Sequence, residues 1–288
     1  MTRSTETCRS ALQGMLVAAA ALLPQFVHAA ESPVEALSDH VMAAVADPSR
    51  PDSDRQRDAD RRPAEVIAFA GIKPGDKLAD FMPGRGYYTR IFCKLVGDGG
   101  QVYAISVPFK RSGPPPTDKP AEAVVGEPCS NVTPSSLQPR MVPAPELWSS
   151  SDDPGAVYEY WASSPAAENF TAAEPLDLIW TSENYHDLHN PAFGSPNLQT
   201  VGRAWLNALK PGGILIVEDH AAEAGSGARD TETLHRIDPA EVQREMLAAG
   251  FVLVAESALL HHPDDRHAVK AHAMHDRTDR FLLKFRKP

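Results

Sequence analysis

Short apolar segments with strand character alternate with helical segments along most of the chain. The predicted strands are residues 78–82, 102–105, 157–160, 176–181, 214–218, 251–256 and 281–285. The predicted helices are residues 39–46, 63–71, 87–96, 198–209 and 240–249. The last of them has Asp238 as N-cap, Pro239 at its first position and Gly250 past its end. Because parallel strands need crossover helices, this alternation predicts an α/β fold with a mostly parallel sheet covered on both faces. A long polar loop joins the last two strands, which permits an antiparallel pairing there.

Proline is unevenly distributed. Residues 108–147 hold ten of the 26 prolines and show neither helical nor strand periodicity. We predict a long irregular insertion after the second strand, either a lid over a ligand site or a flexible flap. With this insertion set aside, residues 30–288 are the length of a single domain.

The first 29 residues have the pattern of an export signal. Arg3 and Arg9 precede an apolar core at residues 14–23, and residues 27–29 place small side chains at both peptidase-contact positions. We expect cleavage after Ala29 and a periplasmic location, with no stable membrane anchor afterwards. An uncleaved anchor helix is the alternative interpretation.

Composition excludes several classes of protein. The formal net charge is −10, whereas a nucleic-acid-binding surface needs a basic footprint. Three cysteines are too few for a disulfide scaffold. Removal of the signal takes away Cys8, and Cys93 and Cys129 then either form one disulfide or remain as thiols.

A glycine-containing turn, residues 80–86 (DFMPGRG), follows the first predicted strand of the sheet and leads into a helix. Ligands of open α/β sheets bind beyond the carboxyl ends of the strands, where glycines let the backbone approach them. One G-x-G is a weak signal by itself. A second marker at residues 209–219, LKPGGILIVED, strengthens it.

Together these motifs resemble the class I S-adenosyl-L-methionine (SAM)-dependent methyltransferases. The three segments that carry the resemblance are ADFMPGRGYYT, LDLIWTSENYHDL and LKPGGILIVEDH. The segments RRPAEVIAFAGIKPGDKLADFMPGRGYYTR, ENYHDLH, TLHRID and TDRFLLKFRKP are similar to a group of exported bacterial predicted methyltransferases. The resemblance spans about residues 55–288, apart from the proline-rich segment. It implies a doubly wound seven-stranded sheet with an antiparallel last strand, SAM as cofactor, and a small-molecule or envelope substrate.

The resemblance also assigns cofactor-binding positions. Asp80, Gly84 and Gly86 would line the methionine end of SAM. The residues expected to border the sulfonium follow the fourth strand and are Ser182, Glu183 and Asn184.

The sequence departs from the family pattern at two of these positions. Ser106 ends the second strand, where the family usually has an acidic residue that binds the ribose hydroxyls. Loss of a charge-assisted hydrogen bond there would lower affinity about tenfold or more. Met82 replaces the first glycine of the usual three-glycine pattern.

Acid–base candidates follow the fourth and fifth strands. His186 and Asp187 follow the fourth strand, His220 follows the fifth, and His235 lies in the next connection. Methyl transfer needs chiefly an in-line approach, so a base is required only where the nucleophile carries a proton. The alternative is that these histidines pack or bond to the backbone. Residues 261–275 hold five histidines, but no recognised metal signature fits, so we predict a solvated polar loop and no metal site.

Two other functions compete with methyl transfer. Export separates the protein from cytoplasmic SAM, which favours a catalytically inactive or repurposed methyltransferase fold that binds a ligand in the periplasm. A nucleotide-dependent oxidoreductase is disfavoured, because Thr89 stands where the third glycine or alanine of a dinucleotide turn belongs.

Overall fold

The computed structural model describes residues 1, 38–107, 131–136 and 166–288. All described residues after residue 30 belong to one compact unit. Its centre is a seven-stranded sheet with the order β3-β2-β1-β4-β5-β7-β6. The strands are β1 (Lys77–Phe81), β2 (Gln101–Ser106), β3 (Val132–Ser136), β4 (Leu176–Ser182), β5 (Leu209–His220), β6 (Val252–Ser257) and β7 (Arg280–Arg286).

Strand direction agrees with the predicted fold class. Parallel pairing joins β3, β2, β1, β4 and β5, whereas β7 runs antiparallel to both β5 and β6. The predicted doubly wound sheet with an antiparallel last strand is therefore confirmed.

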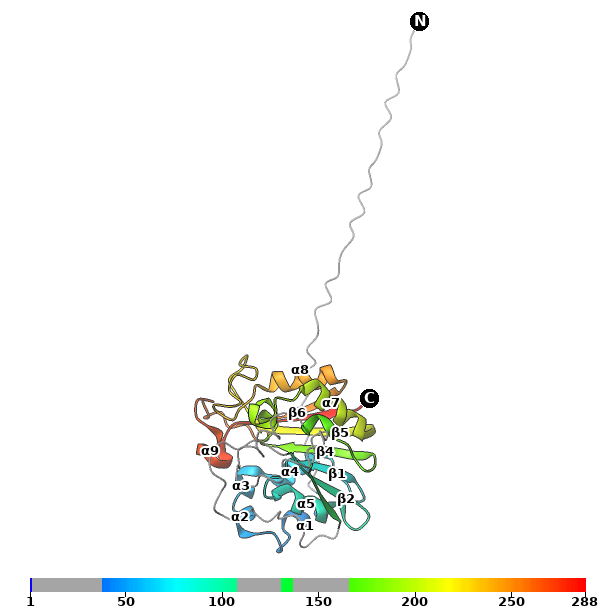
Figure 1. Ribbon diagram of the computed structural model, residues 1–288. Helices are drawn as coiled ribbons and strands as arrows, with labels where there is room; N and C mark the ends of the chain where they lie inside the picture. Colours follow the sequence, from blue (N-terminus) through cyan, green and yellow to red (C-terminus); the bar gives the residue numbers. More distant parts are fainter. Residues whose placement is uncertain (2–37, 108–130, 137–165) are drawn as a thin grey trace, which may run out of the picture. The chain divides into compact units, whose positions relative to one another are not determined.

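Helices cover both faces of the sheet (Figure 1). The α-helices are α1 (Asp39–Val45), α2 (Asp52–Arg55), α3 (Asp58–Arg61), α4 (Pro63–Ala70), α5 (Tyr87–Val96), α7 (Leu198–Ala208), α8 (Pro239–Ala249) and α9 (Ala271–Met274). Short 3₁₀ turns are η2 (Ala166–Asn169), η3 (His186–His189), η4 (Pro191–Phe193) and η5 (His275–Arg277). Helices α1, α4 and α5 pack on one face of the sheet, and α7 and α8 pack on the other. Among the described residues, we find no helix with the length and apolar character needed to cross a bilayer.

The predicted elements differ from the structure mainly at the sheet edge. Strand β3 lies inside residues 108–147, for which we predicted no strand, and it pairs with β2 in parallel. Its sequence, VTPSS, lacks apolar alternation because an edge strand pairs on one side only and tolerates Pro134. The rest of that range, except residue 131, and the predicted strand at residues 157–160 lie outside the described residues.

Local sequence signals account for the start and end of α8. The side chain of Asp238 accepts a hydrogen bond from the backbone N–H of Ala240 at 2.9 Å, and Pro239 takes the first helical position. Gly250 ends the helix with φ +109°, a conformation that favours glycine. These are the three cap positions predicted from the sequence.

Helices α7 and α8 make a close contact through a glycine. A β-carbon built on Gly202 would lie 2.6 Å from Cβ of Ala249 and 3.1 Å from Cε of Met246. Both neighbours are buried against the sheet, so α7 can approach α8 this closely only without a side chain at residue 202.

We therefore expect Gly202→Ala to destabilise the protein by about 1–2 kcal/mol, although alanine is the better helix former. Thermal unfolding monitored by circular dichroism measures the effect. The matched control is Arg203→Ala on the exposed face of α7, which should change the midpoint little. A higher unfolding midpoint for Gly202→Ala than for the original protein would show that α7 and α8 leave room for a side chain at residue 202.

Candidate functional site

A cavity of about 950 Å³ opens at the carboxyl ends of β1, β2 and β4. Strand β1 lies between β2 and β4 in the sheet. The chain moves outward from β1 to β2 on one side of β1 and later continues with β4 on its other side, so the cavity lies at the topological switch point of the sheet. Its lining from the strand ends comprises Asp80, Met82, Pro83, Gly84, Arg85, Ser106, Val107, Ser182, Glu183 and Asn184. Ligand sites of α/β sheets form at this position.

The turn after β1 has an unusual backbone. Met82, Gly84 and Gly86 have φ values of +56°, +56° and +78°. Met82 thus adopts a conformation that favours glycine. A β-carbon on Gly84 would meet no atom of the described residues within 4 Å, so the turn presents open backbone to the cavity. Gly86 caps α5 and is not among the cavity-lining residues.

Asn184 supports this turn from the end of β4. Its Nδ2 donates hydrogen bonds to the carbonyl oxygens of Met82 at 2.8 Å and Phe81 at 3.4 Å. Its Oδ1 accepts a hydrogen bond from the hydroxyl of Thr181. The residue assigned to the sulfonium region therefore also fixes the strained turn.

Asp80 is buried at the cavity wall, with 3% of its surface exposed. Its Oδ2 accepts a hydrogen bond from Oγ1 of Thr89 at 2.5 Å. Burial raises the pKa of Asp80 to about 7, although the Thr89 hydrogen bonds act in the opposite direction. No cation neutralises this carboxyl within the described residues, so a ligand cation would favour its ionised form.

Ser106 and Ser182 both line the cavity but differ in their surroundings. Ser106 is exposed at the end of β2 and brings no charge to that end of the cavity. Ser182 donates a hydrogen bond from its Oγ to Oε2 of Glu218 at 2.7 Å. Ser106 thus lines the cavity at the end of β2 without bringing a carboxylate there.

Glu183 belongs to a buried cluster of charges. Arg61 forms an ion pair with it, and Nη1 of Arg280 donates to its Oε1 at 2.8 Å and to Oε1 of Glu218 at 2.9 Å. Burial raises the pKa of Glu183, but the positive charges of Arg61 and Arg280 have a larger opposite effect. The pKa of Glu183 is therefore below its ordinary value. Arg61 also pairs with Asp276 at 2.8 Å.

Helices α2 and α3 bring side chains to the cavity that were not predicted from the sequence. Asp54, Arg57 and Arg61 line it, and Asp54 accepts two hydrogen bonds from the guanidinium of Arg90 on α5. No helix was predicted between residues 46 and 63. The available signal was its dense mixture of Asp and Arg in SDRQRDADRR, which in the structure forms buried ion pairs.

His186 and His220 lie behind the cavity wall and are buried. Nδ1 of His186 lies 2.8 Å from Oδ1 of Asp219, and its backbone N–H donates to Oδ2 at 2.7 Å. Burial lowers the pKa of His186, but the nearby Asp219 has a larger opposite effect, so the pKa of His186 is raised. Nδ1 of His220 lies 2.7 Å from Oγ1 of Thr278, and burial lowers its pKa to about 4. Neither histidine is among the cavity-lining residues.

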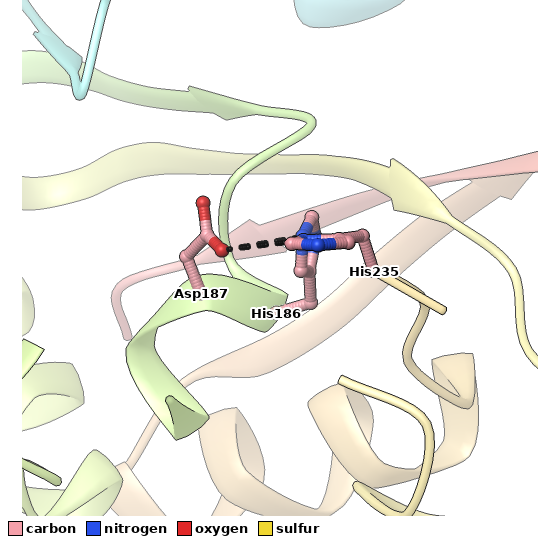
Figure 2. A group of neighbouring side chains, drawn as sticks. All are labelled: His186, Asp187 and His235. Carbon is pink, nitrogen blue, oxygen red and sulfur yellow. Dashed lines mark ion pairs between the residues drawn. The ribbon is translucent and has the colours of Figure 1, made fainter. Parts of the chain in front are cut away.

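Asp187 and His235 are the acid–base candidates that do line the cavity, together with His272. Oδ1 of Asp187 lies 3.4 Å from Nε2 of His186 and 3.8 Å from Nδ1 of His235 (Figure 2). The rings of His235 and His272 have centroids 4.3 Å apart. The structure thus joins residues from η3 and from the segment before α8 at one wall.

The remaining histidines of residues 261–275 have separate roles. His261 and His267 bond to the two carboxylate oxygens of Asp279 at 2.7 and 2.9 Å. This part of the predicted polar loop is a packed hydrogen-bonded turn, because Asp279 also accepts a hydrogen bond from the backbone N–H of His262.

Cys93 is disulfide-bonded, and both other cysteines lie outside the described residues.

Strand order, the antiparallel β7 and the cavity at the switch point define the Rossmann-like methyltransferase fold. No family model and no curated protein matches the chain. Among solved structures, the [4+2]-cyclase SpnF is similar over 81% of this chain and 82% of its own, with 18% identity and a TM-score of 0.50. A SAM-dependent methyltransferase from Aquifex aeolicus matches over 83% of this chain and 99% of its own, with 16% identity and a TM-score of 0.46. The glycopeptide N-methyltransferase MtfA, solved with SAM, covers 78% of this chain and 86% of its own, with 14% identity and a TM-score of 0.44.

Asp80 should make stability depend on pH. The folded carboxyl keeps its proton up to about pH 7, whereas the unfolded chain releases it near pH 4, so stability falls as pH rises between these values. We expect Asp80→Asn to gain on the order of 3 kcal/mol relative to the original protein between pH 5 and pH 8. Urea unfolding at both pH values measures the gain. The exposed Asp98→Asn serves as control, and an equal response of both variants would contradict the assignment.

Proposed function

We propose that the protein transfers the methyl group of SAM to a small-molecule or envelope substrate. The observation that carries the proposal is the large cavity at the switch point, bounded by the glycine turn after β1. Its volume of about 950 Å³ lies in the range of sites that enclose drug-sized ligands.

The residues at the amino-acid end of the cavity fit SAM. Gly84 presents its backbone, and the buried carboxyl of Asp80 has no cation beside it in the described part of the chain, which suits the ammonium of the methionine part. Ser106 would accept a ribose hydroxyl, and Ser182, Glu183 and Asn184 would border the sulfonium. When bound, SAM supplies an electrophilic methyl group, and the protein has to align the acceptor with it.

On the acceptor side, Asp187 lines the cavity together with His235 and His272, and we assign the role of base to Asp187. Its carboxylate would accept a proton from the acceptor, and the adjacent His186 would hold that carboxylate in place. His186 acts as a positioning residue in this scheme, because it does not line the cavity itself. His220 lies behind it and is assigned no contact with substrate.

A repurposed, non-catalytic fold is the second candidate. Ser106 in place of an acid weakens the expected grip on the ribose, and this observation favours another ligand. SpnF, described as a [4+2]-cyclase, illustrates that the fold by itself does not specify methyl transfer.

Calorimetric titration with SAM separates these candidates, and absence of binding at millimolar SAM would contradict methyl transfer.

We further expect Ser106→Asp to tighten SAM binding about tenfold, because a carboxylate accepts stronger hydrogen bonds from ribose hydroxyls than a serine does.

The control for the added charge is Ser53→Asp, which places a carboxylate on another part of the cavity lining. It should not tighten SAM binding. Equal tightening by both variants would mean that the general field of the cavity is responsible, and no change in either would place the ribose away from Ser106.

We also propose export to the periplasm, supported by the signal-like pattern of residues 1–29. Expression of the full chain in a bacterium with an outer membrane should give a periplasmic product whose first residue is Ala30. Ala29→Arg should block processing and accumulate the precursor, because the peptidase needs a small residue there. An unprocessed original protein in the cytoplasm would contradict the proposal.

A further inference from the structure

Three metal-ligating side chains meet at one wall of the cavity: His186, Asp187 and His235. Figure 2 shows the Asp187 carboxylate directed at the imidazole rings, with His186 and Asp187 on η3 and His235 on a separate segment. One ligand atom from each residue lies within 4.8 Å of the other two. Two ligands held tetrahedrally about 2.1 Å from an ion are about 3.4 Å apart. The 3.4 and 3.8 Å distances to Oδ1 of Asp187 are therefore close to those of a bound site.

The two nitrogens that face Asp187 have unmet bonding capacity. Nε2 of His186 and Nδ1 of His235 are buried, and neither makes a hydrogen bond within residues 38–107, 131–136 and 166–288. Buried polar atoms normally have partners, so two such nitrogens beside one carboxylate need an explanation. A bound cation gives both of them a partner.

His186 is held in the orientation that a metal ligand requires. Asp219 accepts hydrogen bonds from both the ring Nδ1–H and the backbone N–H of His186. This directs the other ring nitrogen, Nε2, toward Asp187. A carboxylate behind a ligating imidazole is the usual arrangement at metal sites, because it fixes the ring and increases its basicity.

His235 is fixed by its surroundings in a costly conformation. Its φ is +54°, in the region that favours glycine. The neighbouring Arg236 is fully buried, donates from Nη1 to the carbonyl of Ala221 at 2.9 Å, and pairs with Asp265 at 2.8 Å. Such strain persists where the surrounding structure imposes it, and it is concentrated at functional sites.

We propose that His186, Asp187 and His235 bind one divalent first-row transition-metal ion, with Zn²⁺ as the test ion. Two imidazoles and one carboxylate suit Zn²⁺ and Fe²⁺ rather than Mg²⁺ or Ca²⁺, which prefer oxygen ligands. Asp187 and His235 line the cavity, so the remaining coordination positions face it and can take water or an oxygen of the ligand. This proposal does not depend on methyl transfer, because the ion is held by the protein alone. With the ion bound, Asp187 is a metal ligand and no longer the proton acceptor described above.

The test is titration of the chelator-treated protein with Co²⁺, followed by the visible absorption of the bound ion, and with Zn²⁺ in competition. Asp187→Asn and His235→Asn remove one ligand each, and asparagine tolerates the backbone of residue 235. The matched control, His262→Asn, removes a half-exposed histidine outside the group. Circular dichroism verifies that each variant is folded.

We expect one ion per chain in the original protein and in His262→Asn. Each ligand variant should lose at least about 100-fold in affinity, since even supporting residues of metal sites contribute 10–100-fold. X-ray absorption of the zinc-loaded original protein should report two imidazole nitrogens, so the assignment does not depend on variants alone.

The proposal is overturned if the folded original protein binds no ion, or if only one ligand variant weakens binding. It is equally overturned if His262→Asn weakens binding as much as the ligand variants do, which would indicate a surface site. The titrations contain no SAM, so their outcome is distinct from the calorimetric test of methyl transfer.

Discussion

The ion pair between Arg280 and Glu218 is the interaction on which the rest of the site depends. Arg280 is 1% exposed and Glu218 is fully buried, at the adjoining ends of β7 and β5. The same guanidinium reaches Glu183 after β4 and the carbonyl of Asp60 in α3. Removing one partner of such a pair leaves an uncompensated buried charge, at a cost of about 3–5 kcal/mol. The cluster therefore holds the N-terminal helices against the strand ends.

The elements held together by this cluster supply the polar and charged residues that line the cavity. Apolar packing of β1, β4 and β5 builds the sheet, whereas the charged segment from α2 to α3 adds Asp54, Arg57 and Arg61 to the cavity lining. The glycine turn brings backbone to one part of the lining, and η3 brings the carboxylate of Asp187 to another. The cavity therefore has one part lined by open backbone and another lined by a carboxylate, and the proposed methyl transfer uses both.

Much of the fold follows from local patterns, and the exceptions have physical causes. Helix α8 was predicted with its caps, because Asp238, Pro239 and Gly250 act through the backbone beside them. Strand β3 was not, because its residues VTPSS owe their conformation to hydrogen bonds with β2 and not to their own periodicity. Helices α2 and α3 were missed for a similar reason, since four-residue helices are stabilised by the ion pairs that they make elsewhere in the chain.

By itself, the sequence determined the class of fold, the turn after β1 and the absent acid at Ser106, since alternation, glycine and residue identity are local properties. Only the tertiary structure decided which of the candidate side chains lie together at one part of the cavity. It separates Asp187 at the cavity from His186 and His220 behind it, and it brings His235 to Asp187 from beyond β5. The physical reason is that carboxyl ends of parallel strands meet at one edge of the sheet, so residues distant in the chain become neighbours only when the sheet has formed.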